Sequence, residues 1–153
     1  MTISTDTTVI QGVRKGLEQV KSLFDSLITD INAEITALNL DSGTYTPTLT
    51  NTTNVAASTA YLCQYMRIGS VVTVSGKVDI DTTSTGNTLL EVSLPIASNL
   101  ANTQNLAGTF ANDANDQQGA IYGNTTNDRA ILRYQASSTT NTGFFFTFTY
   151  QII

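Results

Sequence analysis

The region that most constrains the fold runs from Val9 to Leu40, where apolar residues recur at intervals of three and four against a polar background. This spacing is that of a heptad seam on an α-helix. A seam this narrow cannot be buried within a single helix, so it predicts association with copies of the same helix. The predicted seam residues are Ile10, Val13, Leu17, Val20, Phe24, Leu27, Ile31, Ile35 and Leu38.

The predicted helix carries signals at both ends. Thr8 and Gln11 have the spacing of a capping box, which places the start of the helix near residue 9. Asp41, Ser42 and Gly43 are expected to end it, with Gly43 as a left-handed cap.

Several residues indicate how the helix associates. Gly12 and Gly16 each cost about 1 kcal/mol relative to Ala, so association must supply the missing stability. Phe24 is bulky for a two-stranded seam and favours three helices. Glu34 interrupts the seam, which resumes after a stutter. The sequence therefore predicts a trimeric coiled coil, with a helix folded back onto its own chain as the alternative.

From residue 45 onward the apolar period changes to two, as is typical of β-strands. Gly69 and Ser70 form a two-residue hairpin signal, and Pro47 indicates an edge strand. About eight short strands with regular turn signals predict a mainly β fold, a β-sandwich with a jelly-roll arrangement as the leading topology. The predicted strands cover residues 45–50, 60–68, 71–80, 88–94, 104–110, 119–123, 129–135 and 143–153.

Two of these strands carry the predicted core. Gly76 falls on the buried face of its strand and indicates a bulge or a close contact. Cys63, the single cysteine, alternates with Tyr61 and Tyr65 and is expected to be a buried small hydrophobe. The expected inward-facing residues are Val72, Val74, Val78 and Ile80 on the first strand, and Phe144, Phe146, Phe148, Tyr150 and Ile152 on the second.

Composition excludes several classes of function. Charged residues make up 12% of the chain, about half the usual share, and the net charge is −5. No basic patch is present for nucleic-acid binding, and no apolar run is long enough for a membrane span. Residues 1–8 lack the features of a signal peptide, so an extracellular or virion protein would not leave the cell by that route, and release by lysis stays open.

The sequence contains little that could support catalysis or hold a cofactor. Because the chain has no histidine, most catalytic triads and proton shuttles are not available to it. Asp79 and Asp81 indicate a solvated strand end, with a calcium site that includes Thr82 and Thr83 as the alternative. No enzyme activity, metal or cofactor is therefore expected. A second oxygen-rich loop, also explained by turn formation, contains Asn112, Asp113, Asn115 and Asp116.

Four tyrosines raise the question of sugar binding. Tyr61, Tyr65, Tyr122 and Tyr134 could provide a stacking surface for carbohydrate, although buried or cross-strand tyrosines are commoner and three of these four alternate with apolar neighbours. The sequence leaves both interpretations open.

Several segments resemble the head domain of tailed-bacteriophage fibre proteins. They are GTYTPTLTN (43–51), ASTAYLCQYMRIG (57–69), VVTVSGKVDID (71–81), SLPIA (93–97), NDRAILRY (127–134) and the ending 144–153. The resemblance covers the chain from about Gly43 onward. It implies a homotrimeric β-structure at the tip of a fibre on the head or tail of the particle, with the N-terminal part fixing the fibre in place.

These observations predict three parts: a flexible docking segment (1–8), a coiled-coil stalk (9–42) and a β-sandwich head (43–153). The predicted function is a homotrimeric structural fibre on the virion surface, attached through its N-terminus to a capsid or tail protein. Its head would face outward and help adhesion to a host-surface glycan or receptor. The alternative is a carbohydrate-binding β-sandwich module without a virion role.

Overall fold

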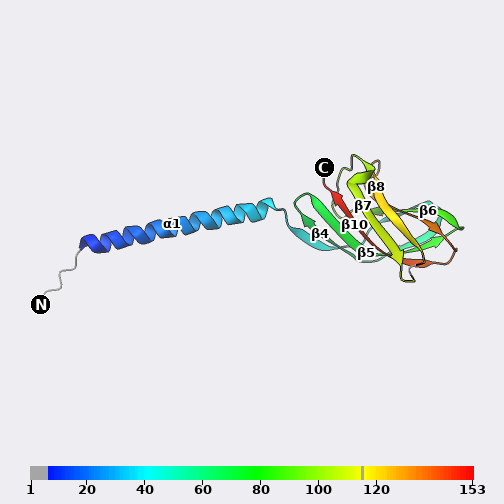
Figure 1. The fold of residues 1–153 in the computed structure, drawn as a ribbon, viewed down its shortest axis with the longest axis horizontal. Helices are drawn as coiled ribbons and strands as arrows, with labels where there is room; N and C mark the ends of the chain where they lie inside the picture. Colours follow the sequence, from blue (N-terminus) through cyan, green and yellow to red (C-terminus); the bar gives the residue numbers. More distant parts are fainter. Residues whose placement is uncertain (1–6, 115) are drawn as a thin grey trace. The chain divides into compact units, whose positions relative to one another are not determined.

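The protein, seen in a computed structural model that describes residues 7–114 and 116–153, divides into two compact units, Met1–Leu38 and Asn39–Ile153. The first contains one α-helix, and the second, called the β unit below, contains the strands (Figure 1). A mainly β protein with one N-terminal helix is therefore confirmed. Most of the predicted docking segment lies outside the described residues, and its last two residues belong to the helix.

Helix α1 (Thr7–Ala37) has 31 residues and a length of roughly 46 Å. Because it begins at Thr7, Thr8 lies inside the helix, and its predicted role as the cap was wrong. Asn39 follows the helix with a φ of 44°, whereas Gly43, the predicted left-handed cap, lies in a strand. Asn is among the few residues that tolerate this conformation. No helix in the described part of the chain has the length and hydrophobicity needed to cross a membrane.

The strands that the described residues form make one antiparallel sheet with the order β1-β4-β5-β10-β7-β8-β9-β6-β2, and β3 also pairs with β5. A short 3-10 helix, η1 (Thr103–Asn105), precedes β7. The strands are β1 (Asp41–Tyr45), β2 (Leu49–Thr53), β3 (Val55–Ala60), β4 (Cys63–Ile68), β5 (Val71–Thr82), β6 (Gly86–Ser93), β7 (Leu106–Asn112), β8 (Gln118–Asn124), β9 (Arg129–Ala136) and β10 (Thr142–Gln151).

The sheet is curled, and one bent segment connects the edge strand β2 to a strand that pairs with β5. Strands β2 and β3 are separated only by Asn54, yet β2 pairs with β6 while β3 pairs with β5. Asn54 has a φ of 57°, and its side chain bonds to Ser84 and Thr88 across the bend. The structure thus shows a curled antiparallel sheet, and the jelly-roll topology stays a prediction.

The predicted hairpin and edge signals have different outcomes. The Gly69-Ser70 turn between β4 and β5 is confirmed, with a φ of 61° at Gly69. The predicted strand 45–50 is instead split, because the buried Pro47 separates β1 from β2, which lie at opposite ends of the strand order. Proline lacks the amide needed for a continuous ladder, so it ends one edge strand before the next begins.

The core forms on the inner faces of β5 and β10, as predicted. Strand β10 pairs along its whole length with β5 and through seven residues with β7. Ile152 is only partly buried, because it follows the end of β10. The predicted residues that are almost fully buried are Val72, Val74, Val78, Ile80, Phe144, Phe146, Phe148 and Tyr150.

Gly76 lies on this inner face because Cys63 occupies the space where its side chain would be. A Cβ atom at Gly76 would lie 2.1 Å from the Cys63 Sγ and 3.1 Å from the Phe146 ring. The register of β10 with β5 continues through Gly76, so the close contact, and not a bulge, explains the glycine. Cys63 is 2% exposed, which confirms it as a buried small hydrophobe.

We expect Gly76→Ala to lower the free energy of unfolding by about 1–3 kcal/mol, because the added methyl group overlaps the Cys63 sulfur. Urea unfolding at one fixed protein concentration measures the loss. The double variant Cys63→Ala with Gly76→Ala should recover part of it, giving a positive coupling in a double-mutant cycle. Additive effects of the two substitutions would contradict the packing account.

Candidate functional site

The apolar side chains of α1 are exposed along the helix in the single chain. The nine predicted seam residues have exposed fractions between 45% (Ile31) and 66% (Leu17), and Leu38 directly follows the last helical residue. Val20, Phe24 and Leu27 also line a shallow apolar groove of about 220 Å³ together with Leu23, which is outside the predicted seam. The helix therefore presents an apolar surface that no other described residue of its unit covers.

A polar cluster on the outer face of β5 joins Tyr61, Lys77 and Asp79. The Tyr61 hydroxyl donates a hydrogen bond to Asp79 Oδ2 at 2.6 Å, and Lys77 Nζ lies 3.0 Å from Asp79 Oδ1. Lys77 Nζ also lies 4.5 Å from the centre of the Tyr61 ring. Gly143 provides the space, since a Cβ atom there would lie 2.7 Å from Lys77 Cε.

The charges of this cluster stabilise one another. Burial acts to raise the pKa of Asp79, but hydrogen bonds from Tyr61 and Lys77 outweigh it and lower the pKa overall. The hydrogen bond to Asp79 raises the pKa of both the Tyr61 phenol and the Lys77 ammonium. Asp79 is therefore an ionised carboxylate that a lysine already neutralises, which disfavours the calcium site considered from the sequence. No group of three or more His, Cys, Asp or Glu residues suited to a metal ion occurs in the described residues.

An exposed apolar ridge lies beside this cluster, and we call Tyr61, Leu62 and Phe145 the Phe145 ridge. Phe145 is 56% exposed and Leu62 is 69% exposed, and both line the same hollow. Phe145 lies opposite Lys77 on β5 and opposite Ala111 on β7. Phe145 is not among the residues predicted from the sequence. It lies between the inward-facing phenylalanines of β10, on the outward face that otherwise carries Thr147, Thr149 and Gln151, and a large apolar residue at such a position could have pointed to it.

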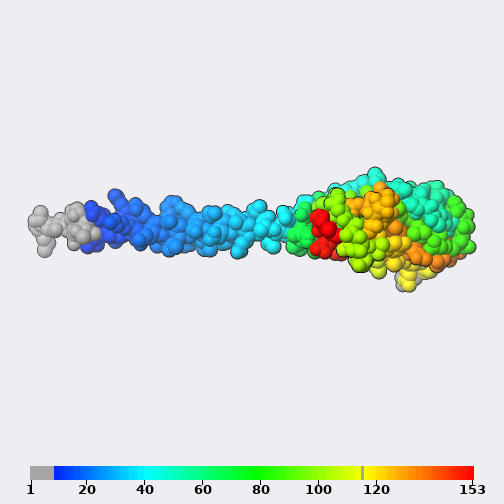
Figure 2. Space-filling view, turned by 90° about the horizontal axis from the view of Figure 1, so that it is seen from above, coloured from blue at the N-terminus to red at the C-terminus, as the bar shows by residue number. Residues whose placement is uncertain are grey.

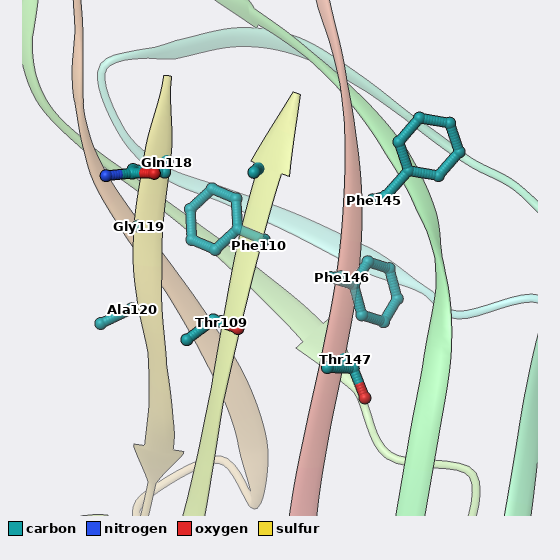
Figure 3. Close-up of a pocket in the computed structure, with 9 residues that line it drawn as sticks. Thr109, Phe110, Gln118, Gly119, Ala120, Phe145, Phe146 and Thr147 are labelled. Atoms are coloured by element: carbon teal, nitrogen blue, oxygen red, sulfur yellow. The ribbon is translucent and has the colours of Figure 1, made fainter. Parts of the chain in front are cut away.

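Two shallow hollows flank Phe145 on the outer face of the sheet. The first, of about 800 Å³, lies over β10, β7 and β8, with Phe145 on one side and Gln118 on the other (Figure 3). The second, of about 510 Å³, lies over β4 and β5. Apart from Lys77, the side chains around both hollows are neutral. Those with polar groups are Thr44, Gln64, Ser75, Thr109, Gln118 and Thr147.

The four tyrosines considered for sugar stacking do not share a surface. Tyr134 is buried and packs edge-on against Phe110 and Phe144. Tyr65 packs edge-on against Tyr45, and its hydroxyl donates to Asp41. Only Tyr61 belongs to the Phe145 ridge. Of the two interpretations left open by the sequence, the packing of Tyr65 and Tyr134 therefore favours contacts between strands.

The second oxygen-rich loop is a turn held by Asn112. Its Oδ1 accepts hydrogen bonds from the backbone amides of Asp116 and Gln117, each at 3.1 Å. Asn115 lies outside the described residues. The amide oxygen is thus engaged in turn formation, as the sequence indicated.

Comparison with known proteins finds no family model and no curated protein that matches the chain. Among solved structures, the chain is similar to the receptor-binding protein gp15 of Listeria phage PSA, with 18% identity and a TM-score of 0.47, over 96% of this chain and 88% of that one. It is also similar to the reovirus attachment protein sigma1, solved with alpha-2,3-sialyllactose, with 9% identity and a TM-score of 0.45, over 75% of this chain and 67% of that one.

Both structures are viral attachment or receptor-binding proteins by name. At these levels of identity and TM-score, neither similarity assigns a function, an oligomeric state or a contact residue to this chain.

We expect Asp79→Asn to lower the pKa of the Tyr61 phenol toward its ordinary value, because the substitution removes the negative charge that favours the protonated phenol. An alkaline titration followed by NMR of labelled tyrosine rings measures the change, and Tyr61→Phe identifies the signal. Asp81→Asn, two residues further along β5, is the matched control. An unchanged Tyr61 titration in Asp79→Asn would contradict the proposed hydrogen bond.

Proposed function

We propose that this protein is a homotrimeric structural fibre on the surface of a tailed-bacteriophage particle, and that its β unit is an outward-facing head that helps adhesion to the host. The observation that carries the proposal is the set of nine exposed apolar side chains of the predicted seam, eight of them on α1 and Leu38 directly after it. The phage-fibre motifs of residues 43–153 provide the virion context. The role is therefore binding and structural, and not catalytic.

The energetics of α1 favour association of several copies. Fully burying a large aliphatic or aromatic side chain contributes roughly 1.5–3 kcal/mol, and the seam leaves nine such residues about half exposed. Isolated helices are marginal in water, and Gly12 and Gly16 weaken this one further. Phe24, at an a position, needs the wider core of three helices. A parallel three-stranded coiled coil satisfies both requirements.

We assign attachment to the particle to the N-terminal residues 1–8, with a capsid or tail protein as the partner. A Cβ atom added to either glycine in the first turns of α1 would meet nothing within 4 Å beyond the adjacent backbone of the helix itself, so packing against the rest of the described chain does not require glycine there. Glycine weakens the helix at these positions, which would let its start adapt to the docking partner. The other end of the chain then carries the head away from the docking point.

We assign adhesion to the Phe145 ridge and its two hollows. An exposed aromatic ring can stack on the apolar face of a sugar, while neutral hydroxyl and amide groups beside it bond to sugar hydroxyls. Phe145 has such groups on both sides, including Gln118 on β8 and Gln64 on β4. This chemistry fits a neutral surface glycan of the host better than a strongly charged ligand.

We expect the double variant Leu17→Asp with Phe24→Asp to dissociate the trimer, because it places buried charges in the seam. Sedimentation and native mass spectrometry should show monomers, while circular dichroism retains the strand signal of the β unit. Lys15→Asp with Ser22→Asp, on the opposite side of the heptad, is the matched control and should remain trimeric. A wild-type monomer, or a trimer unaffected by the seam variant, would overturn the proposal.

We expect Phe145→Ala to reduce binding of the intact fibre to host cells or to arrays of bacterial surface glycans by up to about tenfold, since a stacked aromatic contributes about 0.5–1.5 kcal/mol. The fold should be retained because the ring is mostly exposed. Thr149→Ala, on the same face of β10, is the control. Unchanged binding by Phe145→Ala would show that the ridge has no role in adhesion. Glycan binding by a wild-type chain that is monomeric would favour the alternative, a carbohydrate-binding module without a virion role.

A further inference from the structure

A second group of exposed apolar side chains gathers at one end of β1, β4 and β5, around the Gly69-Ser70 turn. We call Leu40, Met66, Ile68 and Val71 the turn patch; their exposed fractions lie between 46% (Val71) and 59% (Leu40). Ile68 lies directly opposite Val71, and Met66 lies opposite Ser42 on β1. Leu40 and Met66 line a common hollow of about 410 Å³.

The C-terminus extends this apolar surface. The amide of Ile152 donates a hydrogen bond to Ser70 O at 2.7 Å, which fixes the end of the chain beside the turn (Figure 2, C-terminal residues in red). Ile153, the last residue, is 54% exposed. Contiguous exposed apolar side chains of this kind mark a contact surface more often than an ordinary solvated one.

The polar groups that border the turn patch are already bonded within the chain. The Arg67 guanidinium donates to Gly69 O at 2.7 Å, and the Asp41 carboxylate accepts a hydrogen bond from the Tyr65 hydroxyl at 3.2 Å. Arg67 and Asp41 are also register partners on β4 and β1, and their opposite charges leave this border without net charge. The surface therefore fits an apolar, uncharged partner surface.

Chain connectivity determines which partner is near. Leu40 follows Leu38, the last seam residue, by two residues, and an extended chain spans at most about 3.6 Å per residue. Neighbouring helices in a bundle lie roughly 8–10 Å apart. Whatever the orientation of each β unit, the Leu40 residues of three associated chains are thus held within roughly 25 Å of one another.

We propose that the turn patch is a head-to-head interface, covered in the assembled fibre by the same region of the other two copies of this chain. The inference rests on the proposed trimer, and it adds a second contact between the copies, carried by the β units. Val71 and Lys77 are six residues apart on β5, so the turn patch and the Phe145 ridge are separated by roughly 20 Å along the strand. The interface can therefore form while the ridge stays free to bind.

The first test uses thiol crosslinking of the full-length protein. The Met66→Cys variant is treated with a short bismaleimide. Gln118→Cys, at an exposed position on β8, is the matched control, and the wild-type chain, whose Cys63 is buried, is the blank. If the patches meet, Met66→Cys should crosslink between chains about tenfold faster or more than Gln118→Cys, because of its high effective concentration. Equal slow crosslinking of both variants, in samples that native mass spectrometry shows to be trimeric, would overturn the interface.

The second test places a charge in the patch. Ile68→Asp should retain the trimeric mass through the seam but lower the melting temperature by several degrees, whereas Gln64→Asp, on the same face of β4 outside the patch, should not. Equal melting temperatures for the two trimeric variants would overturn the interface. Monomers in the wild-type sample would instead overturn the proposed trimer. If a capsid or tail protein restored the melting temperature of Ile68→Asp, the patch would be assigned to that partner and the head-to-head contact would be overturned.

Discussion

The pairing of β10 with two neighbours along most of its length is the interaction on which the β unit depends. Strand β10 bonds to β5 on one side and to β7 on the other, so it joins the group β1, β4 and β5 to the group β7, β8, β9, β6 and β2. Its inward residues alternate with outward ones, and four aromatic rings reach the core at every second position. The Tyr150 hydroxyl also donates to Ile96 O at 2.7 Å, which ties the segment after β6 to the same strand. The curl of the sheet follows from filling one interior with these rings.

Apolar surface left outside this core is concentrated at three places and not scattered. The helical seam, the turn patch and the Phe145 ridge contain most of the large apolar side chains that remain exposed in the described residues. Between them the outer sheet face carries Thr, Ser, Gln and Ala, whose exposure costs little. The seam and the turn patch are close along the chain, separated only by the link from Leu38 to Leu40. The ridge lies further along β5 and β10. This distribution is the physical basis on which we propose that the seam and the turn patch serve assembly and the Phe145 ridge serves adhesion.

Much of the fold could be predicted from local patterns. The change of apolar period near residue 45 separated helix from strands, and the alternation on β5 and β10 identified the buried faces correctly. These patterns work because a side chain's direction follows directly from the helical or extended backbone. End signals were less reliable. Both Asn39 and Gly43 can adopt a left-handed conformation, so the sequence did not distinguish between them as the residue that ends the helix. In the structure Asn39 has the positive φ.

The sequence by itself determined the seam spacing, the strand periodicity, the inward-facing residues and the absence of histidine chemistry. The tertiary structure alone decided which strands are neighbours, because register and strand order arise from contacts between residues far apart in the chain. Strand pairing brought Lys77 opposite Phe145, placed Cys63 against Gly76 and collected Met66, Ile68 and Val71 around one turn. It also divided the four tyrosines between core and surface. A local pattern states which way a side chain points, and only the fold determines what it meets there.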